Sequence, residues 1–442
     1  MRRIQSTGLL ALVLLLVLAA CGGNNQNSVQ PGSGGGSSSS GEQAASQPPA
    51  EKAELRMTWW GNQKRADLTL QVIELFEKKY PHITIASEFL AQDVFGDKIK
   101  TQMASRSEPD LIILGNDYGD YAERGILRDL TPYVGSEIQI DKFEESFINP
   151  GRYNGQLIGL NLGNNGIGMI YNQTMIENAG LQFPETMNWD ELEAFGKELV
   201  AKLGKGKYAF ADQSNLNEYF EYFLRQRGKA INDNGKVGFT EQDAEDWFAM
   251  WDRFRKEGII PTAEIAAAHV ELSAETSTLI EGLTAMVFRY LNQLPAFQDA
   301  TQDELELGRL PTGGPGAEEG EWLHPGQFIT VSANSKHPKE AAMFIDFMIN
   351  DPEATKVLGS DRGISISAEA REAIKPTLTP PELKMMEYFE EVIAKAKPLP
   401  KQMPAGAWNG ALTNAAQKVA FGRSTAAEAA KEVYQAAADT LK

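Results

Sequence analysis

Apolar and polar positions alternate with strand-like and helix-like periods along most of the chain after residue 50. Residues 55–60 form a short apolar run typical of a strand, and residues 65–80 place Leu68 and Phe76 on one helical stripe that Pro81 ends. Further strands are expected at residues 82–86, 111–114, 169–171 and 284–288. Strands that alternate with helices favour an α/β fold with parallel sheets.

Helix signals continue toward the C-terminus. Asn188 and Glu191 have the spacing of a capping box, and aromatic residues follow a helical period over residues 243–257. Helices are also expected at residues 341–349 and from residue 411 onward. We therefore expect two α/β lobes within residues 51–442, and the lack of internal repeats excludes solenoids and propellers.

The N-terminus has the layout of a secretory signal. Arg2 and Arg3 precede an apolar run at residues 9–20, whose helical length of about 18 Å is too short to cross a bilayer core of roughly 30 Å. We therefore interpret residues 1–20 as a signal peptide. The run ends in Leu-Ala-Ala-Cys21, which resembles the lipobox of bacterial lipoproteins. That resemblance implies that Cys21 carries a lipid anchor.

Residues 21–50 are almost wholly Gly, Ser, Gln, Asn, Pro and Ala after Cys21. Such a segment cannot bury enough apolar surface to fold, so a disordered linker is expected there, with a span of roughly 30 Å. The predicted layout is an anchor, a tether and a folded body outside the cytoplasmic membrane.

Composition excludes several classes of function. The chain has 42 basic and 60 acidic side chains, a formal net charge of -18, which argues against nucleic-acid binding. One cysteine rules out an internal disulfide or a thiolate metal cluster. The four histidines lack metal-ligand spacing, and the common phosphate-binding motifs are absent, so we expect no metal and no cofactor.

Polar and aromatic residues follow several predicted strands. In an α/β protein, ligands gather at the carboxyl ends of strands. Trp59 and Trp60 end the first strand and must point to opposite sides of the sheet, so one can face a crevice. An aromatic ring suits the C–H face of a sugar, and carboxamides pair with its hydroxyl groups. The pattern therefore indicates a carbohydrate site.

The ordered motifs resemble one known family. They include LRMTWWGN, FEKKYPHITI, EPDLIIL, RYNGQLIGLNLGNNGIGMIYNQTMIENAG and, near the C-terminus, MPAGAWNGALTNAAQKVAFGRSTAAEAA. Together the motifs extend over nearly the whole body. The chain resembles the family 1 extracellular solute-binding proteins of carbohydrate ABC importers, which include maltose-binding protein.

The resemblance implies a periplasmic-binding-protein-like fold with three interlobe crossovers and a cleft between the lobes. The N-terminal lobe would be residues 51–162 plus 327–375, and the C-terminal lobe 163–326 plus 376–442. The implied protein is a monomer that binds sugar, is not an enzyme, and docks on membrane permease subunits. The expected ligand-binding residues are Trp59, Trp60, Asn62, Asp97, Asn116, Asp117, Asn164, Asn165, Asn217, Tyr219, Arg289, Tyr290, Asn292, His324 and Trp408. Among them, Trp408 has the family's ring-stacking position, whereas Asn292 stands where the family has a second ring.

Two alternatives stay open. A secreted, lipid-anchored glycosidase or lyase would need a pair of carboxylates about 5 to 10 Å apart, and 60 acidic residues single out no pair. The acidic composition would also suit a binding protein for a peptide or a polyamine. The sequence identifies neither the sugar, nor its length, nor whether it is a uronate.

Overall fold

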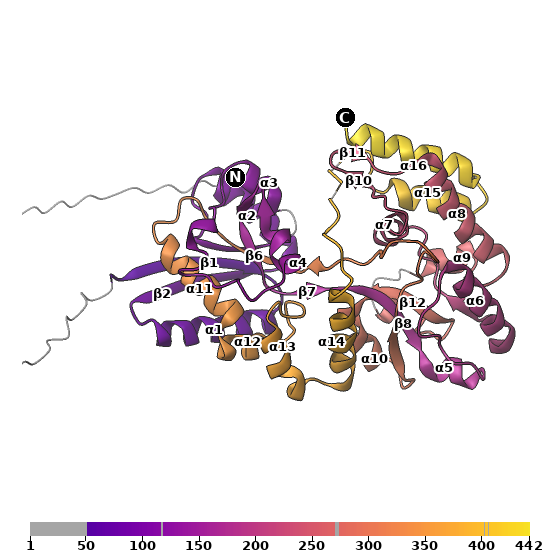
Figure 1. Ribbon diagram of the computed structural model, residues 1–442, viewed down its shortest axis with the longest axis horizontal. Coiled ribbons are helices and arrows are strands. Elements are labelled where there is room, and N and C mark those ends of the chain that lie inside the picture. The colour runs from indigo at the N-terminus through magenta and orange to yellow at the C-terminus, as the bar shows by residue number, and fades with distance from the viewer. Residues whose placement is uncertain (1–50, 116–117, 270–273, 402, 405) are drawn as a thin grey trace, which may run out of the picture. The chain divides into compact units, whose positions relative to one another are not determined.

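The strands form two main sheets (Figure 1). The computed structural model describes residues 51–115, 118–269, 274–401, 403–404 and 406–442. The first sheet has the order β2-β1-β3-β15-β6 and the second has the order β13-β8-β12-β9. The predicted signal peptide, Cys21, the linker, Asn116 and Asp117 all lie outside the described residues.

The strands of the first sheet are β1 (Ala53–Trp60), β2 (Ile83–Leu90), β3 (Leu111–Leu114), β6 (Gly159–Asn161) and β15 (Phe328–Val331). Those of the second are β8 (Ile167–Asn172), β9 (Tyr208–Phe210), β12 (Thr284–Tyr290) and β13 (Leu305–Gly308). Three two-stranded pairs join β4 (Arg152–Tyr153) to β5 (Gln156–Leu157), β7 (Asn164–Asn165) to β14 (His324–Pro325), and β10 (Asn232–Asp233) to β11 (Lys236–Val237).

The helices are α1 (Gln63–Lys79), α2 (Gln92–Ala104), α3 (Tyr118–Glu123), α4 (Glu145–Ile148), α5 (Gln173–Asn178), α6 (Trp189–Leu203), α7 (Asn217–Arg225), α8 (Glu241–Lys256), α9 (Ala263–Ala268), α10 (Leu294–Asp299), α11 (Pro338–Asn350), α12 (Pro352–Leu358), α13 (Ala368–Ile374), α14 (Pro380–Ile393), α15 (Ala411–Ala420) and α16 (Ala426–Thr440). Short 3₁₀ turns are η1 (Thr131–Tyr133), η2 (Asn149–Gly151), η3 (Ala274–Thr276), η4 (Leu291–Gln293) and η5 (Lys375–Thr377).

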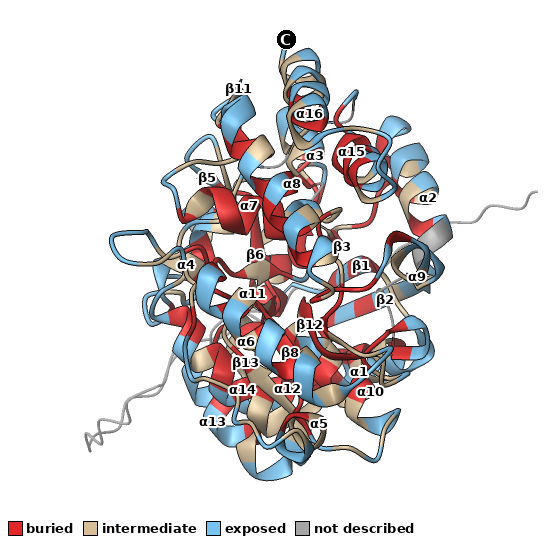
Figure 2. Ribbon diagram, turned by 90° about the vertical axis from the view of Figure 1, so that its right-hand side faces the viewer, coloured by how far each residue is buried: buried red, intermediate tan, exposed pale blue. Residues whose placement is uncertain are grey.

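The predicted elements form with small shifts at their ends. Asn62 caps α1 by accepting a hydrogen bond from the backbone of Arg65, which moves the helix start two residues before the expected one. The capping box of Asn188 and Glu191 is present at the start of α6. Buried residues concentrate on the strands and on the inner faces of the helices (Figure 2), as the hydrophobic periods require.

The prediction of parallel sheets is right for only part of the structure. β1 is parallel to β2 and β3, but β15 is antiparallel to β3 and β6. In the second sheet β12 is parallel to β9 and antiparallel to β8. The parallel rule holds for strands joined by a helix within one sheet. β8 and β15 follow strands of the other sheet instead, so the rule does not fix their direction.

Three segments lie side by side where the chain passes between sheets. The chain goes from β6 through β7 to β8, and returns from β13 through β14 to β15. β7 pairs with β14, and Asn164 exchanges backbone hydrogen bonds with Ile364 at 2.8 and 2.7 Å. The backbones pack so closely that a Cβ atom at Gly163 or at Gly326 would lie 2.7 Å from the carbonyl oxygen of Arg362.

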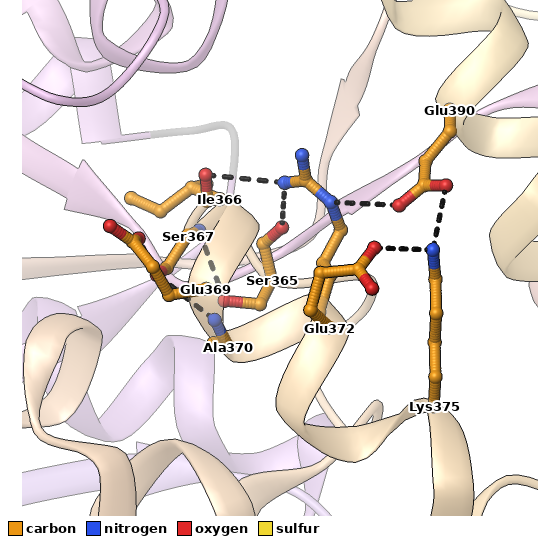
Figure 3. A network of polar contacts seen from close by, with 9 residues as sticks. Ser365, Ile366, Ser367, Glu369, Ala370, Glu372, Lys375 and Glu390 are labelled. Carbon is orange, nitrogen blue, oxygen red and sulfur yellow. Dashed lines mark hydrogen bonds and ion pairs between the residues drawn. The ribbon is translucent and has the colours of Figure 1, made fainter.

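A polar network joins α13 to α14 (Figure 3). Arg371 donates to the carbonyl oxygen of Ser365 at 2.9 Å and lies 3.7 Å from Glu390 of α14. Lys375 also pairs with Glu390, at 3.1 Å, and with Glu372. α13 packs on α12, whereas α14 packs on α10 and β13. The network therefore ties α13 to α14 through Glu390.

Candidate functional site

Polar and aromatic side chains from four distant segments meet at the carboxyl end of β12. We call Asn165, Glu218, Tyr290, Asn292 and His324 the β12-end cluster. Tyr290 is the last residue of β12 and is partly exposed, and its hydroxyl donates a long hydrogen bond of 3.4 Å to Glu218. Burial, and then the charge of Glu218, raise the pKa of the Tyr290 hydroxyl far above its usual value. Tyr290 therefore stays neutral and offers a ring and a hydroxyl group.

The β7–β14 pair brings two more members to the same place. His324 lies opposite Asn165 in the ladder. The amide of Asn165 donates to Asn292 Oδ1 at 2.7 Å, and the backbone of Asn292 donates to Asn165 Oδ1 at 3.2 Å. This reciprocal pair fixes both carboxamides while Asn292 stays exposed. The arrangement presents fixed donors and acceptors to solvent.

His324 lies between two aromatic rings. Its ring is edge-on to Tyr290 with centroids 4.9 Å apart, and its centroid is 4.8 Å from that of Trp322. Burial, assisted by the positive charge of Arg225, lowers the pKa of His324 to about 3. The imidazole is therefore neutral at physiological pH. Its Nε2 atom is buried and has no hydrogen-bond partner among the described residues.

Two residues beside the cluster are absent from the candidate set drawn from the sequence. Trp322 is buried, and the guanidinium of Arg225 lies 5.4 Å from its ring centroid. Arg225 also donates to the carbonyl oxygen of Pro398 at 3.0 Å. Arg225 and Pro398 are 173 positions apart, so no local pattern signals this contact.

The end of β1 differs from the end of β12. Trp59 is fully buried and stacks on Phe89 at 6.3 Å. Its side chain has no exposed surface in this structure, and its role as a ligand contact stays a prediction. Trp60 is partly exposed, and the guanidinium of Arg65 lies over its ring at 5.6 Å. Arg65 is in turn fixed by an ion pair of 2.7 Å to Asp361.

Three further predicted ligand contacts are also buried in this structure, and their role stays a prediction. Tyr219 is 3% exposed and packs edge-on against Phe288, with centroids 5.3 Å apart. Arg289, on β12, is 4% exposed. Trp408 is 4% exposed and packs against Phe239 at 6.3 Å, within the core of the second sheet. Tertiary packing covers these side chains.

The remaining candidates lie apart from the cluster or serve local structure. Asn62 is exposed, yet its side-chain oxygen caps α1. Asn164 is buried and accepts a hydrogen bond of 2.6 Å from the amide of Asn161. Asp97 on α2 and Asn217 at the start of α7 are exposed. Of the fifteen expected ligand-binding residues, the structure brings four into the cluster, namely Asn165, Tyr290, Asn292 and His324.

Comparison with known proteins identifies the family. A sequence profile described as bacterial extracellular solute-binding protein matches residues 71–385. This match spans more than half of the chain, so the chain belongs to that family, whose members are binding proteins. A solved family 1 extracellular solute-binding protein from Alicyclobacillus acidocaldarius has a TM-score of 0.78 and 27% identity, and the match covers 89% of this chain and 100% of that one. The protein therefore has the two-lobe α/β fold of periplasmic solute-binding proteins.

Two more relatives are named for their ligands. The multiple sugar-binding protein of Streptococcus mutans is 24% identical over 316 residues, which are 68% of this chain and 72% of that protein. The structure of a periplasmic oligogalacturonide binding protein from Yersinia enterocolitica has a TM-score of 0.76 and 23% identity, and the match covers 86% of this chain and 97% of that one.

Two features are absent from the described residues. No helix there has both the length and the apolar character needed to cross a membrane. No group of three or more His, Cys, Asp or Glu side chains there is arranged to hold a metal ion.

Proposed function

We propose that this protein captures a sugar or oligosaccharide outside the cytoplasmic membrane and delivers it to the permease subunits of an ABC transporter. Cys21 would carry the lipid anchor, with the segment to residue 50 as tether. Family membership supports a binding role, and relatives named for sugar and oligogalacturonide binding support the ligand class. The lipobox-like sequence before Cys21 supports the anchor.

The observation that carries the proposal is the β12-end cluster. It combines an accessible tyrosine ring with carboxamides and a carboxylate, which are the groups that a pyranose needs for stacking and for its hydroxyls. Within the cluster Glu218 is the single carboxylate. A glycosidase would need a second one at a defined distance, so the cluster favours binding over hydrolysis.

The neighbouring passages between the sheets support a hinged mechanism. On this proposal the lobes are residues 51–162 plus 327–375 and residues 163–326 plus 376–442. The β7–β14 pair and the segment at Ile364 would bend together as the hinge. A ligand that contacts both lobes only in the closed form shifts the population toward that form. The permease would then recognise the closed form.

A binding screen tests the proposal. The full chain, purified in a nonionic detergent, is titrated calorimetrically with mono- and oligosaccharides and, for comparison, with peptides and polyamines. We expect a dissociation constant of order micromolar for at least one saccharide, about -8 kcal/mol. Binding of peptides or polyamines alone would contradict the sugar assignment. Turnover of a saccharide during the titration would favour the alternative function of a glycosidase or lyase.

Two substitutions at one position separate the ring from the hydroxyl. Tyr290→Ala should weaken binding of the responding saccharide about tenfold, because it removes about 1.4 kcal/mol of ring contact. Tyr290→Phe keeps the ring and loses only a long hydrogen bond, so its effect should be less than about threefold. Tyr133→Ala, in η1 beside the first sheet, is the control. Equal affinity of Tyr290→Ala and the unaltered chain would remove the β12-end cluster from the site.

A further inference from the structure

A cavity with a volume of about 470 Å³, which we call the Arg152 pocket, is lined by residues between 118 and 152 and by residues between 396 and 401. Three segments line it: the start of α3, the stretch from α4 through η2 to β4, and the extended segment after α14. The residues that line it are Tyr118, Gly119, Ser146, Asn149, Pro150, Arg152, Ala396, Pro398, Leu399, Pro400 and Lys401. None of them belongs to the β12-end cluster.

The charge of this pocket is opposite to that of the chain as a whole. The chain carries 60 acidic and 42 basic side chains, yet the pocket is lined by two cations, Arg152 and Lys401, and by no carboxylate. Among the described residues, no Asp or Glu forms an ion pair with either cation, whereas Arg65, Arg255 and Arg309 all do. Arg152 is partly exposed, so its guanidinium is accessible to a ligand.

The other lining groups suit a sugar ring. The hydroxyl of Tyr118 donates to the carbonyl oxygen of Pro150, which holds its ring against Phe328 at 4.6 Å as part of the wall. The opposite wall is apolar, from Pro398 and Leu399. Ser146 Oγ is buried without a hydrogen-bond partner among the described residues, and Asn149 adds a carboxamide. Apolar walls with a few polar groups match the two kinds of surface on a pyranose.

Two hydrogen bonds join the segment that lines the pocket to residues beside the β12-end cluster. Arg225, which lies over Trp322 beside the cluster, donates to the carbonyl oxygen of Pro398 in the pocket wall at 3.0 Å. The backbone of Lys397 donates to the carbonyl oxygen of Glu321 at 2.9 Å. The extended segment after α14 therefore borders both the pocket and the residues just before β14.

We infer that the Arg152 pocket binds the carboxylate of a uronate unit, and that the ligand is an acidic oligosaccharide. This inference rests on the proposed function and specifies its ligand. A guanidinium binds a carboxylate through two parallel hydrogen bonds, which a neutral sugar cannot match, and Lys401 adds a second positive charge. Ser146 and Asn149 are left to pair with the hydroxyl groups of the same unit.

Matched ligands test this inference by calorimetry on the full chain in nonionic detergent. The probes are oligosaccharides of two to four galacturonate or glucuronate units, each paired with the neutral galactose or glucose oligomer of the same linkage. Each pair differs only in a carboxylate or a hydroxymethyl group. At least one acidic member should bind at least about tenfold more tightly than its neutral partner, and added salt should reduce that preference.

Variants assign the preference to the pocket. Arg152→Gln should weaken binding of the acidic ligand about tenfold or more and leave binding of the neutral partner within about twofold, whereas Arg152→Lys should retain part of the preference. Lys401→Gln should have a smaller effect in the same direction. Arg124→Gln, which removes an exposed arginine outside the pocket, is the matched control. Unchanged melting temperatures confirm that the variants fold.

The outcomes separate this inference from the proposed function. Equal or tighter binding of the neutral members, or an acidic preference that survives Arg152→Gln, would overturn the inference and leave sugar binding intact. Failure of every acidic and neutral saccharide to bind would overturn the proposed function itself. If Arg152→Gln weakened binding of acidic and neutral ligands equally, Arg152 would support the shape of the site and would not bind the carboxylate. That result would also overturn the inference.

Discussion

The ends of β1 and β12 both carry aromatic side chains, but neighbouring residues cover them to different extents. At β1, one indole is fully buried and the next, Trp60, is covered by Arg65, which Asp361 holds in place. At β12, Tyr290 stays partly open, with the edge of His324 on one side and the exposed Asn292 nearby. Both ends have the sequence pattern expected of a ligand site. The difference shows that the pattern alone does not decide how far neighbouring side chains cover an aromatic strand end.

The largest expected effect concerns the buried indole. Trp59→Ala should lower the free energy of unfolding by about 3–5 kcal/mol, because it leaves a cavity in the core of the first sheet. Trp60→Ala should cost less than about 1 kcal/mol, since part of that ring already meets solvent. Urea-induced unfolding measures both. Equal losses of unfolding free energy would mean that Trp59 and Trp60 are equally buried.

Much of the fold is predictable because its signals are local. The stripe that predicts α1, the capping box of Asn188 and Glu191, and the apolar run of β3 each specify an element within about twenty residues. Boundaries shift by a few residues where a cap such as Asn62 begins a helix early. The direction of β8 and β15 was not predictable, because it depends on which sheet the preceding strand joined.

The site was less predictable, because burial of one side chain depends on distant segments. Alternation along β1 shows that the two tryptophans point in opposite directions, but not that Phe89 covers Trp59. Trp408 has a motif position, yet Phe239 packs against it. The contact of Arg225 with Pro398 joins positions that no local period relates. Sequence patterns therefore find the strand ends and leave their accessibility to tertiary packing.

The second prediction concerns Arg65, whose guanidinium lies over the ring of Trp60. Arg65→Ala should lower the free energy of unfolding by about 1–2 kcal/mol, a value between those of exposed and buried ion pairs, because Asp361 loses its partner in a mostly buried position. It should also expose the indole, so acrylamide should quench the tryptophan fluorescence more strongly. The same change in a Trp60→Phe background should show no added quenching, which assigns the signal to this ring among seven tryptophans.

The third prediction concerns pH at the other strand end. The pKa of His324 is lowered to about 3 by burial and by Arg225, whereas a histidine in the unfolded chain titrates near 6.5. Between these values the unfolded chain binds a proton that the folded chain does not. The neutral imidazole therefore costs no stability above about pH 6.5, and stability falls as the pH decreases from there toward 3.

The size of that effect is measurable by substitution. From about pH 7.5 to about pH 5.5, the unaltered chain should lose about 1.4 kcal/mol more unfolding free energy than His324→Asn, which has no proton to gain. The control is His82→Asn, which removes a histidine whose ring is edge-on to Tyr80. Parallel pH profiles for His324→Asn and the unaltered chain would show that solvent reaches the imidazole freely. The β12 end would then be even more open than its contacts with Tyr290 and Trp322 indicate.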